Sequence, residues 1–100
     1  MNVGIPPKHL TQIRAIFQKH SQIIDVILYG SRAKGTHRPG SDIDIAVKGH
    51  AIDGRLLAQI AADYDALYLP WKLDLCVYEQ IANPELRAHI DRVGISLCER

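Results

Sequence analysis

The chain has 100 residues and a formal net charge of +1, from 12 basic and 11 acidic side chains. This length suits one small domain over residues 1–100, and the balanced charge argues against a protein whose main task is to grip nucleic acid. No apolar run is long enough to span a bilayer, and no secretory leader precedes Pro6. Two cysteines without a signal peptide, Cys76 and Cys98, favour reduced thiols, so we expect a globular cytoplasmic protein.

The first half of the chain predicts a helix, a strand, a short helix and a second strand. Pro6–Pro7 opens the first helix, which carries an apolar stripe at helical spacing. The stripe consists of Leu10, Ile13, Ile16 and Phe17. A β-branched run from Ile23 to Tyr29 stops at a glycine and is typical of a strand. A short helix is expected over residues 31–34, ended by Gly35, with a second strand over about 43–48.

The second half predicts two longer helices and one or two strands. Asp53 caps a helix that Pro70 stops. Its apolar stripe consists of Leu56, Leu57, Ile60, Ala61, Tyr64, Leu67 and Tyr68. Residues 72–78 alternate as a strand, with Asp74 and Cys76 on the less apolar face. A last helix begins at Asn83-Pro84 and ends at Gly94, and residues 95–98 are a candidate short strand.

This order of elements predicts an α/β fold, a mixed sheet of three to four strands with helices packed on it. Ser31 follows the first strand and Asp42 precedes the second, so both reach one ligand only if these strands run antiparallel. Asp74 stands early in the third strand. It meets Asp44 only if the second and third strands are parallel neighbours.

Asp42 and Asp44 are candidate metal ligands. Side chains two residues apart in a strand project from the same face, and two like charges so close are unfavourable unless cations neutralise them. Asp74 on the neighbouring strand would complete a set of hard oxygen ligands that suits Mg²⁺. The alternative is that each aspartate caps a loop or pairs with a nearby cation: Arg32, Lys34 or Lys72.

Gly30 and Ser31 mark a candidate phosphate site. Glycine lets the backbone approach a phosphate closely, and the amides that begin the following helix carry partial positive charge. Arg32 and Ser41 complete the candidate nucleotide-binding set, although the same residues also fit an ordinary strand-to-helix turn with a serine cap. The five histidines (9, 20, 37, 50 and 89) have no zinc-like spacing and are interpreted as solvated surface residues.

Together these residues form a pattern: Gly30-Ser31, ten intervening residues, then Asp42-apolar-Asp44-apolar. The segment LYGSRAKGTHRPGSDIDIAV closely resembles the signature of the DNA-polymerase-beta-like nucleotidyltransferase superfamily, whose smallest members are the minimal nucleotidyltransferases (MNT). This resemblance implies that the glycine-serine pair holds a nucleoside triphosphate, with ATP as the expected substrate. It also implies that Asp42 and Asp44 bind Mg²⁺, two ions being expected, and that Asp74 is the third carboxylate.

The resemblance further implies a partner. Minimal nucleotidyltransferases are typically paired with a helical HEPN ribonuclease toxin, and the antitoxin transfers AMP from ATP to a toxin tyrosine. By analogy we expect a Mg²⁺-dependent protein adenylyltransferase with a helical HEPN-type partner. Trp71, with residues 68–70, is a candidate apolar contact for that partner, and the alternative is that it packs in the core. Two alternatives stay open. One is a non-catalytic antitoxin that neutralises its partner by occlusion, and the other is nucleotidyl transfer to a small molecule or an RNA end.

Overall fold

The computed structural model describes residues 3–98. Its elements are, in order, α1 (Pro7–Gln18), β1 (Ile23–Tyr29), α2 (Gly30–Lys34), β2 (Ile43–Gly49), α3 (Gly54–Asp65), β3 (Leu73–Val77), the 3₁₀ turn η1 (Tyr78–Gln80), α4 (Pro84–Val93) and β4 (Ile95–Ser96). The strands form one sheet in the order β3-β2-β1-β4. Strand β1 is antiparallel to β2 and β4, whereas β2 and β3 are parallel. The predicted mixed sheet and the relative directions of its first three strands are confirmed.

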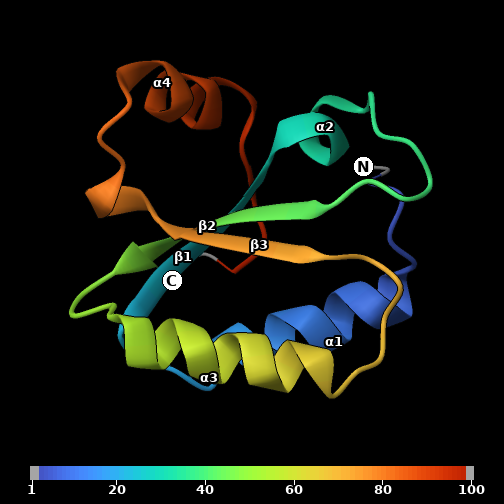
Figure 1. The fold of residues 1–100 in the computed structure, drawn as a ribbon, viewed down its shortest axis with the longest axis horizontal. Coiled ribbons are helices and arrows are strands. Elements are labelled where there is room, and N and C mark those ends of the chain that lie inside the picture. The colour runs from blue at the N-terminus through green and yellow to red at the C-terminus, as the bar shows by residue number, and fades with distance from the viewer. Residues whose placement is uncertain (1–2, 99–100) are drawn as a thin grey trace.

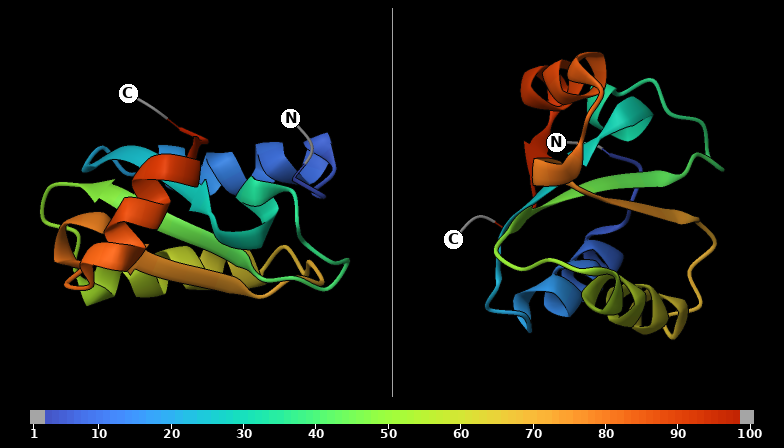
Figure 2. Two further views of the ribbon diagram at one scale, coloured as in Figure 1. Left: turned by 90° about the horizontal axis from the view of Figure 1, so that it is seen from above. Right: turned by 60° about the vertical axis from the view of Figure 1, so that its left-hand side comes forward.

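The sheet lies between two helical layers. Helices α1 and α3 cover one face, and α2 and α4 lie over the other (Figures 1 and 2). The larger hydrophobic core lies under α1 and α3 and includes Phe17, Ile43, Ile45 and Ile60. On the opposite face a small cluster of Ile27, Ala46 and Ile90 supports α4. None of the helices in the described part of the chain is long and apolar enough to cross a membrane.

The predicted helix boundaries have the expected chemistry at three places. The Asp53 carboxylate accepts the amide of Leu56 at 2.9 Å and caps α3. Asn83 caps α4 in the same way. Gly35 ends α2 in the left-handed conformation, with φ of 78°. A glycine is favoured there because an L side chain is strained at positive φ.

The end of α3 differs from the prediction. The helix ends at Asp65 instead of continuing toward Pro70, and Tyr68 adopts a left-handed conformation with φ of 53°. Tyr68 is 92% exposed, so its assignment to the buried stripe is wrong, and Ala61 is exposed as well. The chain leaves the helix through tight turns in which the Leu67 and Tyr68 amides donate to the carbonyls three residues earlier. The third and fourth strands are also shorter than predicted, since Tyr78 begins η1 and β4 ends at Ser96.

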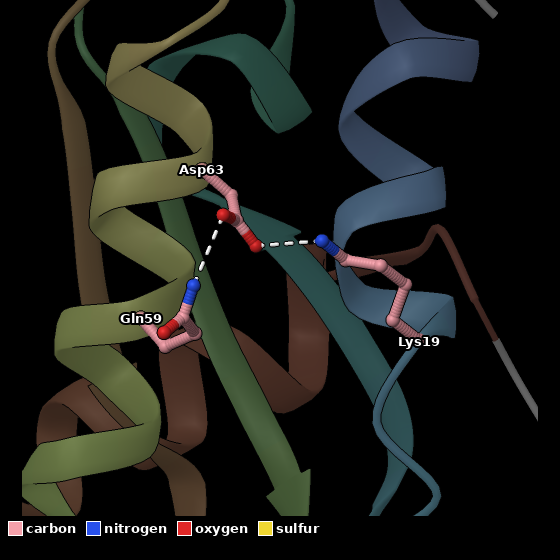
Figure 3. Close-up of polar contacts among 3 residues, drawn as sticks. All are labelled: Lys19, Gln59 and Asp63. Atoms are coloured by element: carbon pink, nitrogen blue, oxygen red, sulfur yellow. Dashed lines mark hydrogen bonds and ion pairs between the residues drawn. The ribbon is translucent and has the colours of Figure 1, made fainter.

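A surface contact joins α1 to α3 on the far side from the second helical layer. Lys19 Nζ lies 2.7 Å from Asp63 Oδ2, and Gln59 Nε2 donates to Asp63 Oδ1 at 3.1 Å (Figure 3). The hydrogen bond from Lys19 lowers the pKa of Asp63. This contact supports the packing of the two helices over the large core.

Candidate active site

Asp44 lies near two further acidic side chains, Asp74 and Asp42, on the sheet face that carries α2 and α4. Asp44 in β2 pairs with Tyr29 in β1 on one side and with Asp74 in β3 on the other. Ile43 and Ile45, which flank Asp44, are fully buried in the core under α1 and α3. Because side chains alternate along a strand, Asp44 must face the opposite side of the sheet. The sequence prediction therefore placed Asp44 and Asp74 on the correct strands, while Asp42 lies immediately before β2, and its shared face with Asp44 stays a prediction.

Negative charge from two neighbouring carboxylates acts on Asp44. The pKa of Asp44 is raised, first by burial and then by the negative charges of Asp74 and Asp42. Arg32 and His89 act in the opposite direction but are smaller causes. Asp42 and Asp74 are exposed, whereas Asp44 is half-buried. The site thus concentrates negative charge that a cation would relieve.

Gly30 lies directly against Asp44. Its φ is +76°, and a Cβ built on this glycine would clash with Asp44 Oδ2. Glycine is required twice at this position, for the left-handed backbone and for the space that the carboxylate occupies. Ser31 follows in the first turn of α2, so the predicted phosphate site begins beside the carboxylates.

Arg32 and Ser41 are also in contact, through the Arg32 side chain and the main-chain carbonyl of Ser41. The Arg32 guanidinium donates to the Ser41 carbonyl from Nε at 3.1 Å and from Nη2 at 2.7 Å. Its Nη1 donates to the Val3 carbonyl at 2.9 Å, and the side chain is only 1% exposed. The Ser41 hydroxyl accepts the Arg38 amide at 2.8 Å. Contact of Arg32 or Ser41 with a nucleotide stays a prediction, while the observed contacts order the loop before β2.

Sequence reasoning missed three residues that line the site. The Tyr29 hydroxyl lies 3.6 Å from Cys76 Sγ, and the pKa of Tyr29 is raised, mainly by burial and by this hydrogen bond. His89 of α4 accepts the Gly30 amide on Nε2 at 3.2 Å, and its ring packs edge-on against Tyr29. The solvated interpretation holds for His50, which is exposed, but His89 is half-buried, as are His9, His20 and His37. The alternation of residues 72–78 places Cys76 on the same face as Asp74, but the predicted site does not include Cys76.

The carboxylates of Asp42, Asp44 and Asp74 suit a hard divalent cation that is also coordinated by the phosphates of a bound nucleotide. Within residues 3–98 no cluster of three or more His, Cys, Asp or Glu side chains forms a ready-made metal cage. Mg²⁺ does not need such a cage, since it takes one or two carboxylates and fills its octahedron with phosphate oxygens and water. The negative charges of Asp74 and Asp42 beside Asp44 fit that mode of binding.

The comparison with protein families agrees with this geometry. Residues 11–100 match the profile of the family described as "Polymerase beta, Nucleotidyltransferase". The chain belongs to this nucleotidyltransferase family. The matched range contains the glycine-serine pair and all three carboxylates, so the family predicted from the spacing of the motif is confirmed.

Relatives of this nucleotidyltransferase extend the comparison. The chain is 29% identical over 91 residues to the candidate protein adenylyltransferase MJ0128 of Methanocaldococcus jannaschii, a match that covers 84% of this chain and 93% of the relative. A chain of a toxin–antitoxin crystal structure with AMP-PNP is 25% identical, with a TM-score of 0.74, over 91% of this chain and 73% of that one. A chain of the tri-AMPylated Shewanella oneidensis HEPN toxin in complex with MNT antitoxin shares the fold, with a TM-score of 0.70 at 18% identity, over 96% and 74%.

Proposed function

We propose that this nucleotidyltransferase transfers AMP from ATP to a hydroxyl, a tyrosine of a helical HEPN-type partner, and acts as the antitoxin of a toxin–antitoxin pair in the cytoplasm. The observation that carries the proposal is the pairing of Asp44 with Asp74 directly beside Gly30. The relatedness to a candidate protein adenylyltransferase and to a toxin–antitoxin structure with AMP-PNP supports the choice of nucleotide and acceptor. In this proposal residues 1–100 act as one minimal nucleotidyltransferase domain.

In this proposal the carboxylates bind metal ions, and the turn after β1 binds phosphates. Asp42, Asp44 and Asp74 would hold two Mg²⁺ ions, which neutralise charge on the attacking and leaving oxygens. Ser31, together with the first amides of α2, holds the β- and γ-phosphates. The acceptor oxygen attacks the α-phosphorus as the bond to the pyrophosphate oxygen breaks, and the acceptor proton passes to Asp74. Alignment and charge neutralisation provide most of the rate.

The test is label transfer in a defined mixture. The chain is mixed with a purified helical HEPN-type protein as the candidate partner and incubated with Mg²⁺ and ATP labelled at the α-phosphate. We expect label on a tyrosine of that partner. ATP labelled at the γ-phosphate should leave no label on the protein, because that phosphate leaves with pyrophosphate. Addition of EDTA or the Asp44→Asn substitution should also abolish labelling. Full transfer by a folded Asp44→Asn variant would contradict the assignment. Label in a small molecule or an RNA end would replace the protein acceptor.

A second candidate function is neutralisation by occlusion. The surface beside the end of α3 favours it, because a cavity of about 410 Å³ lies there with Trp71 and Leu69 in its lining. Tyr68, which also lines the cavity, is 92% exposed and offers an aromatic contact to a partner. Inhibition of the partner by the double variant Asp42→Ala/Asp44→Ala, with no label on any protein, would select occlusion over transfer.

A further inference from the structure

Arg32 is the one buried charged side chain among residues 3–98, with 1% of its surface exposed. Burial of a guanidinium is unfavourable unless its N–H groups have partners. Here the partners that the structure gives are backbone carbonyls, of Ser41 and of Val3. The guanidinium is thus held inside the protein by backbone carbonyls, and its charge also acts on the nearby Asp42 and Asp44.

The contacts of Arg32 connect three segments that are far apart in the sequence. Two of its N–H groups converge on the Ser41 carbonyl, at the end of the loop from α2 to β2. A third reaches Val3 in the N-terminal segment. The guanidinium carbon also lies 5.5 Å from the centre of the Trp71 ring, in the segment that leads into β3, which is within cation–π range.

These segments lead directly to the carboxylates. Ser41 is bonded to Asp42, and Trp71 lies three residues before Asp74. The Ile43 amide donates to the Lys72 carbonyl at 2.8 Å, so the two segments are also joined to each other. Fixing the Ser41 carbonyl and the Trp71 ring thus fixes where both carboxylate-bearing strands begin.

The N-terminal segment is shaped to accept this contact. Gly4 has φ of +75°, and a Cβ there would clash with Arg32 Nη1 and with the His37 ring. Val3 and Ile5 on either side of it are buried in the large core. The carbonyl that accepts from Arg32 therefore belongs to a segment whose side chains are packed in the core.

We propose that Arg32 is a positioning residue for the metal-binding carboxylates, acting through the Ser41 carbonyl and the Trp71 ring, and is not a ligand of the polyphosphate. This role rests on the proposed function, because it takes Asp42 and Asp74 as Mg²⁺ ligands. A phosphate ligand would have to leave the contacts described above. Lysine keeps the charge but carries a single ammonium, which cannot bond two carbonyls and stack on an indole together.

The deciding variant is Arg32→Lys, with Arg14→Lys as its matched control. Arg14 also donates to a backbone carbonyl, that of Leu97 at 3.0 Å, but belongs to α1, and within residues 3–98 neither this hydrogen bond nor that from Cys98 to its carbonyl involves the loop before β2. Binding of AMP-PNP is measured by calorimetry in EDTA and then at increasing Mg²⁺. We expect Arg32→Lys to raise the Mg²⁺ concentration for half-maximal binding at least tenfold and to leave affinity in EDTA within twofold. Arg14→Lys should leave both quantities unchanged.

Hydrogen exchange gives a readout that does not depend on metal or turnover. The amides of Ser41 and Ile43, which donate to Arg38 and Lys72, should exchange at least tenfold faster in Arg32→Lys and at the wild-type rate in Arg14→Lys. Unchanged exchange, or a tenfold loss of affinity in EDTA, would overturn the positioning role. If wild-type protein fails to transfer AMP while these differences persist, the proposed function fails and the positioning role stands.

A second variant allows the proposal to be tested even if Arg32→Lys does not fold. Trp71→Leu removes the ring under the guanidinium and leaves both carbonyl bonds in place. We expect a smaller rise in the Mg²⁺ requirement, about threefold, again with unchanged affinity in EDTA. A wild-type Mg²⁺ requirement in a folded Trp71→Leu protein would overturn the part of the proposal that concerns Trp71.

Discussion

Replacement of Gly30 by alanine tests the contact between the glycine-serine turn and the carboxylates. The new Cβ meets Asp44 Oδ2, and the backbone at Gly30 has φ of +76°. The left-handed conformation costs an L residue roughly 1–2 kcal/mol, which corresponds to a fall in Tm of about 4–8 °C per kcal/mol in a domain of this size. The clash also moves the Asp44 carboxylate, and a misplacement of about 1 Å at a reacting centre lowers the rate about 100-fold.

Gly35→Ala separates these two effects. Gly35 has nearly the same backbone conformation, with φ of +78°, but nothing lies within 4 Å of a Cβ built there. We therefore expect similar losses in Tm for both variants, measured by thermal denaturation. AMP transfer at saturating ATP should fall about 100-fold in Gly30→Ala only. Equal transfer rates in the two variants would refute the idea that transfer requires a residue without a Cβ at position 30, next to the Asp44 carboxylate.

Other predictions concern charge and helix ends. Asp44→Asn should abolish transfer and leave the circular dichroism spectrum unchanged. Since the folded pKa of Asp44 is raised above 3.8, the wild type loses stability as pH rises from about 3.8 through that folded pKa, and denaturant titrations should find this loss absent in Asp44→Asn. Asp53→Ala removes the cap of α3 and should lower the free energy of unfolding by about 1 kcal/mol in urea titrations, with unchanged transfer. Lys19→Met should lower Tm only at low salt, because the pair with Asp63 is on the surface; an equal loss in 1 M salt would contradict this.

The strand directions and the pairing of Asp44 with Asp74 could be predicted from local rules. Period-two alternation predicts that Asp42 and Asp44 share one face, and the requirement that Ser31 and Asp74 reach the same ligand leaves one arrangement of three strands. The observed register, with Asp44 opposite Asp74, follows that argument. Such inferences succeed because they depend on residues close together in the sequence or on the geometry of neighbouring strands.

Long-range side-chain contacts could not be predicted in this way. Arg32 reaches Val3, which is 29 residues away, and the Gly30 amide reaches His89, which is 59 residues away. Nothing in the pattern of α2 says that Arg32 rather than Lys34 is buried. The exposed position of Tyr68 was missed for a different reason. Its left-handed backbone conformation is at a residue other than glycine, so nothing in the sequence signals the turn. Pro70 indicates only that the helix must end before it.

One face of β2 contributes to the stability of the fold, and the other carries the candidate catalytic carboxylate Asp44. On one face Ile43 and Ile45 are fully buried, and burial of each such side chain contributes roughly 1.5–3 kcal/mol. On the other face the pKa of Asp44 is raised, first by burial and then by the negative charges of Asp74 and Asp42. The isoleucines hold the strand in place against this repulsion, so the carboxylates can stay close together before any ligand arrives. Ligands that neutralise them therefore bind to a site that is already formed, and their binding energy adds to the stability of the fold.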